Sequence, residues 1–299
     1  MTEQGGADNL GTIFKINTNG TGYATLHQFA TGIGDGHLPF GGLTLAGSTL
    51  YGTTAQGGSS GAGTLFKIEL NGSGYMLLHQ FTGVQGDGRN IEHSLTLVGT
   101  TLYGVTNQGG KNGTGTIFKI NTDGGGYSVF YSFEGSTGND GHPSSPLTLV
   151  NGHLVGSTDP IDASIPDIIY SIALDGSGFG VLYRFNGPTT EGREPTGDLA
   201  VIDSTMYGVT SQGGTGRGVV YALALPILKI VSVNHSNDGH FVLTGQSFPN
   251  SSIAIATSPD LATGFMPFDT TTADANGVFQ YDDDGVAGVP MKFYRAVEP

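Results

Sequence analysis

Short apolar segments alternate along the chain with glycine-rich and polar stretches, and no long amphipathic run interrupts this alternation. Four such segments recur in a fixed order, as in residues 95–133 with LTLVG, LYGVT, GTIFKI and YSVFYSF. Each segment has the length of a strand, is rich in Thr, Val, Ile, Tyr and Phe, and is bounded by Gly, Asn or Asp. Runs of this kind are typical of β-strands and lack the spacing of a helix. The pattern therefore predicts an all-β protein.

The order of the segments repeats with a constant period. LYGTT, LYGVT, LVGST and MYGVT begin at residues 50, 102, 154 and 206, so each lies 52 residues after the one before. Between the third and fourth segments stand the turn pairs Asn19-Gly20, Asn71-Gly72, Asp123-Gly124 and Asp175-Gly176. Such pairs supply the positive φ angles of a tight hairpin turn, so the flanking segments should pair as antiparallel strands. Four antiparallel strands in a unit of about 50 residues are the signature of a propeller blade, with the kelch repeat as the nearest period.

The repeats predict a β-propeller-like domain over residues 1–226. Its units lie near 43–94, 95–146 and 147–198, with partial units at both ends. The third segment occurs five times and the other three occur four times, so two arrangements stay open. In the first, four blades form a ring and residues 23–29 close the blade begun at residue 199. In the second, five blades exist, of which the first and last are incomplete.

The period stops after Pro226. Residues 227–299 contain new apolar segments separated by Asn, Asp, Gly and Pro. This pattern predicts a separate, small immunoglobulin- or fibronectin-like β-sandwich of about six strands.

Composition and charge exclude several kinds of function. The chain has 11 Lys and Arg against 25 Asp and Glu, a formal net charge of -14, which disfavours binding to nucleic acid or to an anionic membrane surface. It has no Cys, so disulfides, thiolate metal sites and thiol nucleophiles are excluded. No apolar run reaches the length of a spanning helix, so we expect no direct membrane insertion. The opening MTEQGGADNLG lacks the features of a signal peptide and begins inside a repeat, so we expect a trimmed N-terminus.

The columns LYGTT, QGG, GTIFKIN, DGxGY and LHQF resemble the GloVer tandem repeat of bacterial proteins. The resemblance covers roughly residues 4–225. It implies an extracellular or cell-surface protein with a propeller-like body, and it brings no established activity.

The loops that lead from one unit to the next are the best candidates for a binding site. Each holds a carboxylate followed two residues later by a cationic or titratable side chain: Asp35 and His37, Asp87 and Arg89, Asp140 and His142, and Glu191 and Arg193. In a four-stranded meander these DG loops share a rim with the QGG loops. The residues there could bind a polar ligand such as a sugar. We expect no cofactor, although the carboxylates could hold Ca²⁺. The alternative is that Asp-Gly simply forms the turn and the charges are solvated.

The function expected from these observations is that of a non-catalytic extracellular or cell-surface repeat protein, whose propeller presents a loop face to a polysaccharide or a surface protein. One alternative is a propeller-type carbohydrate-active enzyme, a glycosidase or lyase that uses the rim carboxylates. Another is a purely structural surface array without a specific ligand. No nucleophile motif is present, so no catalytic residue is assigned.

Overall fold

The computed structural model describes residues 1–32, 34–84, 86–135, 140–160, 165–186, 192–214, 216–235, 240–258, 265–284 and 292–297. Within these ranges the regular elements are β-strands and no α-helix is present. The predicted fold class, an all-β protein of propeller-like repeats, is confirmed. The same described residues contain no helix long and apolar enough to cross a bilayer.

The repeats form five main antiparallel sheets, which we call units 1 to 5, together with two separate two-stranded sheets among the described residues. Unit 1 contains β1 (Thr12–Lys15) and β2 (Ala24–Gln28). Unit 2 contains β4 (Thr44–Ala46), β5 (Thr49–Thr54), β7 (Thr64–Glu69) and β8 (Met76–Gln80). Unit 3 contains β10 (Thr96–Val98), β11 (Thr101–Thr106), β13 (Thr116–Asn121) and β14 (Ser128–Ser132). Unit 4 contains β15 (His142–Pro143), β16 (Thr148–Val150), β17 (His153–Asp159), β18 (Ile168–Ala173) and β19 (Gly180–Arg184). Unit 5 contains β20 (Arg193–Ile202), β21 (Thr205–Gln212) and β22 (Val220–Ala224).

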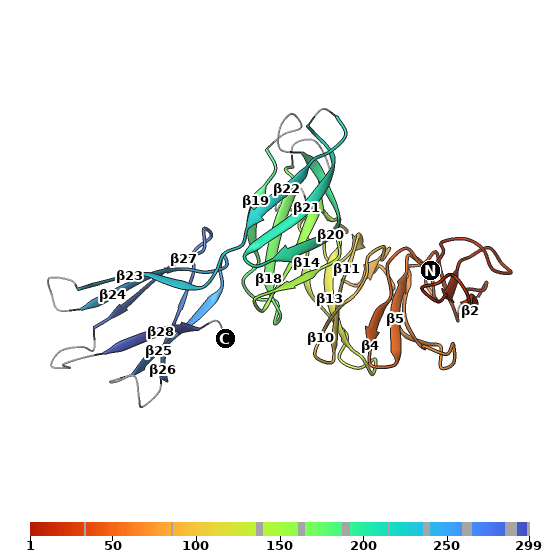
Figure 1. The fold of residues 1–299 in the computed structure, drawn as a ribbon, viewed down its shortest axis with the longest axis horizontal. Coiled ribbons are helices and arrows are strands. Elements are labelled where there is room, and N and C mark those ends of the chain that lie inside the picture. The colour runs from red at the N-terminus through yellow and green to blue at the C-terminus, as the bar shows by residue number, and fades with distance from the viewer. Residues whose placement is uncertain are drawn as a thin grey trace.

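Units 2 and 3 are four-stranded meanders in the expected order, β4-β5-β7-β8 and β10-β11-β13-β14. Unit 5 ends after its third strand. Within the described part of the chain, β1 and β2 pair with each other and with no strand of unit 5. Residues 23–29 therefore do not close the blade begun at residue 199, and the arrangement with five units is the one observed. Figure 1 shows the units following one another in chain order from β2 to β22.

A glycine on the second strand of each unit explains the LYG motif. A Cβ atom on Gly52 would lie 2.5 Å from Cζ of Phe66, and one on Gly104 would lie 2.5 Å from Cζ of Phe118. The ring from the third strand thus occupies the space that a side chain on the second strand would need. Glycine at this column lets the ring pack flat on the neighbouring strand.

The turn glycine explains the Asn/Asp-Gly pairs. The Gly72 amide donates to the Glu69 carbonyl at 2.8 Å, and Gly72 has φ of 90°. Asn71 keeps a negative φ, and its side-chain oxygen accepts from the Ser73 amide at 2.9 Å. Only the glycine therefore supplies the left-handed conformation, whereas the Asn or Asp caps the turn.

Apolar cores lie between successive units. The position after the Gly-Thr of the third strand belongs to these cores in units 1 to 4, where its residues are Ile13, Leu65, Ile117 and Ile169. Each of these four side chains is 0% exposed. The equivalent residue of unit 5, Val220, is 77% exposed. Face-to-face packing of neighbouring sheets is therefore the interaction that holds the repeats together, at about 25 cal/mol per Å² of buried apolar surface.

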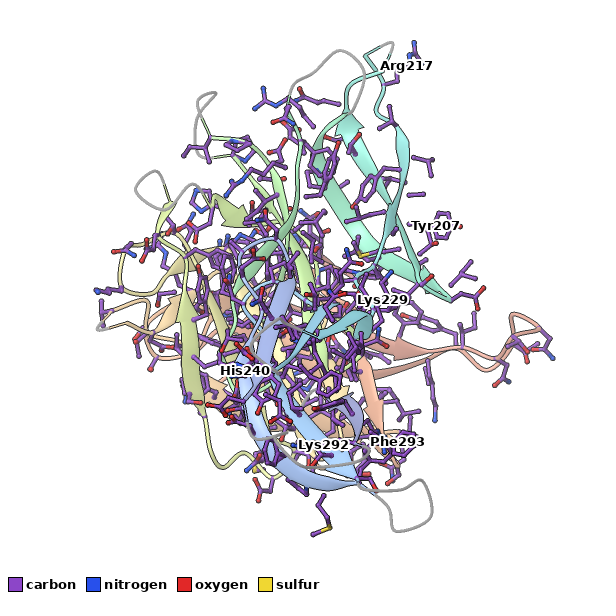
Figure 2. The ribbon with its side chains drawn as sticks, turned by 90° about the vertical axis from the view of Figure 1, so that its left-hand side faces the viewer. Tyr207, Arg217, Lys229, His240, Lys292 and Phe293 are labelled. Atoms are coloured by element: carbon purple, nitrogen blue, oxygen red, sulfur yellow. The ribbon has the colours of Figure 1, made fainter. Side chains whose placement is uncertain are left out.

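Residues after Pro226 form two three-stranded antiparallel sheets, β23-β24-β27 and β26-β25-β28, which we call the C-terminal unit. Its strands are β23 (Lys229–His235), β24 (Phe241–Gln246), β25 (Ser252–Ser258), β26 (Met266–Thr272), β27 (Val278–Asp283) and β28 (Phe293–Val297). The two sheets share a core that includes Leu243, Ile255 and Phe279. In Figure 2 this unit carries the labelled residues from Lys229 to Phe293.

Two side chains of the C-terminal unit contact the repeats. Phe248 is fully buried in the core between units 4 and 5, and its ring stacks on that of His153 with centroids 4.3 Å apart. The side-chain amide of Asn250 also donates to the Phe179 carbonyl at 2.9 Å. The C-terminal unit is therefore packed onto unit 4.

Candidate functional site

The DG loops and QGG loops meet at one rim, as the meander predicts. The two-residue strands β3 (Gly36–His37) and β6 (Gln56–Gly57) pair with each other, and β9 (Gly88–Arg89) pairs with β12 (Gln108–Gly109) in the same way. Gly57 has φ of +92°, and a Cβ there would lie 2.7 Å from the Asp35 carbonyl oxygen. The first glycine of QGG is thus required by both conformation and close approach.

The first DG carboxylate, Asp35, is buried and fully bonded. Its Oδ2 accepts from the Ala30 amide at 3.0 Å and lies 3.0 Å from His27 Nε2. Its Oδ1 accepts from the Gly36 amide and the Tyr75 hydroxyl. Burial raises the pKa of Asp35, but these hydrogen bonds lower the pKa by more, so the net shift is downward. Asp35 is therefore an ionised acceptor that joins units 1 and 2.

The second DG carboxylate repeats this arrangement. Asp87 accepts from the amides of Thr82 and Gly88, each at 2.8 Å, and from the Tyr127 hydroxyl of the next unit. His79 Nε2 lies 3.5 Å from Asp87 Oδ2. Burial raises the pKa of Asp87, and the hydrogen bonds outweigh it, so the pKa falls well below its usual range.

The third DG carboxylate is stabilised by fewer side-chain hydrogen bonds than the first. Asp140 accepts from the Glu134 and Gly135 amides and, at 3.0 Å, from the Tyr131 hydroxyl. Tyr131 occupies the position of the His in units 1 and 2. Phe179, which has no hydroxyl, occupies the position from which a tyrosine hydroxyl reaches Asp35 and Asp87. Burial therefore dominates and raises the pKa of Asp140.

The fourth DG loop differs again. Glu191 lies outside the described residues. Arg193 Nε lies 3.6 Å from Oδ2 of Asp167, a side chain that is 0% exposed. Arg193 is therefore the partner of the buried Asp167 carboxylate, which directly precedes β18.

Arg89 and His142 contact groups other than the carboxylates two residues before them. Arg89 donates to the Gln108 side chain at 2.9 Å, and His142 Nδ1 lies 3.0 Å from the Asn107 carbonyl oxygen. His37 is half-buried beside the QGG strand of its own rim. Among the described residues, no hydrogen bond or ion pair joins Asp35, Asp87 and Asp140 to one another. No group of three His, Asp or Glu side chains in those ranges is placed to hold a metal ion.

Sequence reasoning missed the aromatic contacts between units. Tyr127 of unit 3 stacks on His79 with centroids 3.6 Å apart and contacts Phe81 and Phe118, each at 5.9 Å. We call such a set of three rings a ring box. Two of its rings come from the fourth repeat segment of one unit and the third comes from the third strand of the next unit, and together they surround an aromatic ring of that next unit. Three boxes are filled: His27, Phe29 and Phe66 surround Tyr75; His79, Phe81 and Phe118 surround Tyr127; and Tyr131, Phe133 and Tyr170 surround Phe179. The aromatic columns that recur every 52 residues were the available signal.

A groove of about 880 Å³ runs along β19 between the third DG loop and the C-terminal unit. Tyr131, Glu134 and Asp140 line it on the repeat side. Along and beyond β19 it is lined by Phe179, Gly180, Val181, Leu182, Tyr183, Arg184 and Asn186, and on the far side by Asn250, Ala275 and Asn276. The groove is the place where a predicted site residue, aromatic rings and several hydrogen-bonding side chains come together.

Residues 1–165 match the family model of the Gloeobacter/Verrucomicrobia repeat, which confirms the resemblance to the GloVer repeat. No curated protein matches the chain. Among solved structures, a Bacteroides fragilis protein assigned as a 6-phosphogluconolactonase is 13% identical, with 97% of this chain and 94% of that chain covered and a TM-score of 0.41. The periplasmic gluconolactonase of Pseudomonas aeruginosa is 14% identical, with 98% and 93% covered and a TM-score of 0.42. At this level the similarity carries no argument about activity.

Proposed function

The chain belongs to the Gloeobacter/Verrucomicrobia repeat family, and we propose that it is a non-catalytic protein that binds a neutral polysaccharide in the groove along β19. The observation that carries the proposal is the mixed lining of the groove. It combines the rings of Tyr131 and Tyr183 with the polar side chains of Arg184, Asn186 and Asn276. Sugar hydroxyls need convergent hydrogen-bonding groups, and the apolar faces of sugar rings pack on aromatic side chains.

Size and charge support this class of ligand. The groove volume of about 880 Å³ lies within the usual range of ligand sites, roughly 300–1,000 Å³, and its length along a strand suits an extended chain. The formal net charge of -14 repels polyanions, so a neutral polysaccharide fits better than an acidic one. We propose that this binding occurs outside the cell or at its surface, as the family resemblance implies.

The bonding of the carboxylates favours binding over hydrolysis. A glycosidase needs two carboxyl groups that reach the scissile bond. Asp140 is 3% exposed, and it already accepts from two backbone amides and the Tyr131 hydroxyl. Among the described residues that line the groove, Glu134 is the one exposed acid. The enzymatic alternative therefore has less support than the binding function.

Calorimetric titration with a panel of soluble neutral polysaccharides tests the proposal. Arg184→Ala and Asn276→Ala should each weaken binding by about tenfold, the loss of one hydrogen bond to a ligand at about 1.4 kcal/mol. Arg89→Ala is the matched control, since Arg89 is an exposed arginine on a different DG loop. The proposal fails if no polysaccharide binds, or if Arg89→Ala weakens binding as much as Arg184→Ala. Release of new reducing ends during the titration would instead favour the enzyme.

A further inference from the structure

The ring box of unit 4 lacks the aromatic side chain that fills the other three. By position in the repeat, Tyr183, Phe185 and Tyr221 correspond to His79, Phe81 and Phe118. Tyr183 and Phe185 lie 5.1 Å apart, and Phe185 and Tyr221 lie 5.3 Å apart, as centroid distances. No aromatic side chain follows Tyr221 in the repeat, because Leu225 and Pro226 replace the hairpin and fourth strand.

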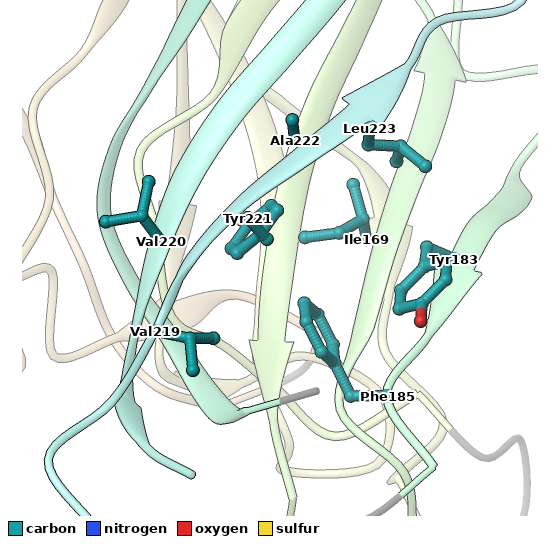
Figure 3. A pocket seen from close by; sticks show the side chains of 8 residues that line it. All are labelled: Ile169, Tyr183, Phe185, Val219, Val220, Tyr221, Ala222 and Leu223. Atoms are coloured by element: carbon teal, nitrogen blue, oxygen red, sulfur yellow. The ribbon is translucent and has the colours of Figure 1, made fainter. Parts of the chain in front are cut away.

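A cavity lies where the missing ring would be. It has a volume of about 350 Å³, and its lining includes Tyr183, Phe185 and Tyr221 together with Ile169 and Leu223. Figure 3 shows these side chains directed toward one space between β22 and unit 4. In the filled junctions this space holds Tyr75, Tyr127 or Phe179.

The free edge of β22 borders the same cavity. β22 pairs with β21 and, among the described residues, with no other strand. Thr210 donates its amide to the Val219 carbonyl, so the alternation of an antiparallel ladder directs the backbone groups of Val220 and Ala222 away from β21. In unit 3 the residue equivalent to Val220, Ile117, is paired with Tyr131 of the fourth strand. An unpaired edge beside an apolar cavity is the arrangement that accepts an added strand.

Each copy of the fourth strand among the described residues is already used in its own unit. The four copies lie at residues 23–29, 75–81, 127–133 and 179–185, and β2, β8, β14 and β19 in these segments are each paired within their own units. We take the occupant to be a segment of another polypeptide. The filled positions define its chemistry: an extended segment with a Tyr or Phe followed six residues later by Phe.

We propose that unit 5 binds an extended segment of a separate protein, which adds to the edge of β22 as a fourth strand and inserts an aromatic ring into the cavity formed by Tyr183, Phe185 and Tyr221. Main-chain hydrogen bonds to β22 supply part of the affinity, and the ring in the box supplies selectivity. This site shares Tyr183 with the groove along β19 that the polysaccharide would use, whereas Phe185, Tyr221 and the edge of β22 do not line that groove.

Fluorescence anisotropy with the full chain and a labelled peptide of residues 124–134, GGGYSVFYSFE, tests the proposal. We expect saturable binding. The same peptide carrying Tyr127→Ser should bind at least about tenfold more weakly, because it lacks the ring. Val220→Lys in the protein should weaken binding of the unchanged peptide by a similar factor, since a lysine would stand against the added strand. Val220 is exposed, so this variant keeps the fold.

Ile202→Lys is the matched control, because Ile202 is 62% exposed on the same sheet but lies on β20, at the other side of β21. Peptide binding should be unchanged in this variant. The proposal is overturned if the peptide does not bind, if Tyr127→Ser has no effect, or if Ile202→Lys is as damaging as Val220→Lys. It is also overturned if sedimentation shows self-association of the protein alone that Val220→Lys abolishes, because the occupant would then be a second copy.

Discussion

Units 3 and 5 carry nearly the same strands and bury them differently. In unit 3, Ile117 is 0% exposed and Tyr103 is 6% exposed, because unit 4 packs on them. In unit 5 the equivalent Val220 is 77% exposed and Tyr207 is 38% exposed. Figure 2 shows Tyr207 projecting outward from the sheet of unit 5.

The difference shows that a repeated residue takes its role from what covers it. Within the filled junctions, aromatic rings, DG carboxylates and apolar side chains are all used in contacts between units. Where the repeat is interrupted, the same columns become a surface with an open edge. Candidate binding sites therefore lie at the end of the repeat and not in the residues that repeat most faithfully.

The largest expected effect is on the free energy of unfolding, at the buried residue Ile117. Ile117→Ala should lower the free energy of unfolding by about 2–5 kcal/mol, because it removes apolar surface and leaves a cavity between units. Val220→Ala should change it by less than about 0.5 kcal/mol, since the side chain is exposed. Denaturant titration of the full chain measures both. Equal losses in the two variants would show that Val220 is covered.

The next effect concerns the carboxylates that link neighbouring units by hydrogen bonds. Asp87→Asn should cost about 2–3 kcal/mol at neutral pH, because the carboxylate accepts charge-assisted bonds from both units. The pKa of Asp87 is lowered in the folded state, so wild-type stability is present above the unfolded pKa of about 4 and is lost as pH falls below it. Asp87→Asn should show less of this acid-dependent loss. Asp123→Asn, in an exposed turn, is the control and should differ from wild type by a few tenths of a kcal/mol. A similar pH slope in Asp87→Asn and wild type would contradict the assignment.

A smaller effect, of opposite sign, is expected in unit 4, where the QGG motif is replaced and Asp159 follows Thr158. Burial, together with the charges of Asp167 and Glu194, raises the pKa of Asp159 to about 6 against a hydrogen bond from Ser144 that lowers it. A raised carboxyl pKa means that stability is lost as pH rises from about 4 to 6. Asp159→Asn should remove that loss and stabilise the protein by about 1–2 kcal/mol at pH 7. Thermal unfolding at pH 4 and pH 7 checks this, and a variant that is less stable at pH 7 would contradict it.

Local pattern predicted most of the fold. The strands, the NG hairpins and the shared rim of the DG and QGG loops all follow from period and turn chemistry. The position of strand β26 and the short rim strands such as β3 were not predicted, because Met266–Thr272 and Gly36–His37 carry too few apolar residues to give a strand signal.

The site was harder to predict because its contacts cross between units. Asp35 pairs with His27 and Tyr75 and not with His37, and nothing in the spacing of the DG loop indicates that choice. Burial also decides whether a carboxylate only forms a turn or links two units by hydrogen bonds, and burial depends on the neighbouring unit. The open ring box follows from the sequence only once the filled boxes are known.

The absence of cysteine in the chain allows the comparison to be measured directly. Single-cysteine variants Ile117→Cys and Val220→Cys place one thiol at the same repeat position in a buried and an open unit. Labelling of the native protein with a thiol reagent should modify Val220→Cys at nearly the rate of the unfolded chain, whereas Ile117→Cys should react orders of magnitude more slowly, through opening of the fold. Equal protection of the two thiols would show that another segment already covers unit 5, and would contradict the open fourth-strand position.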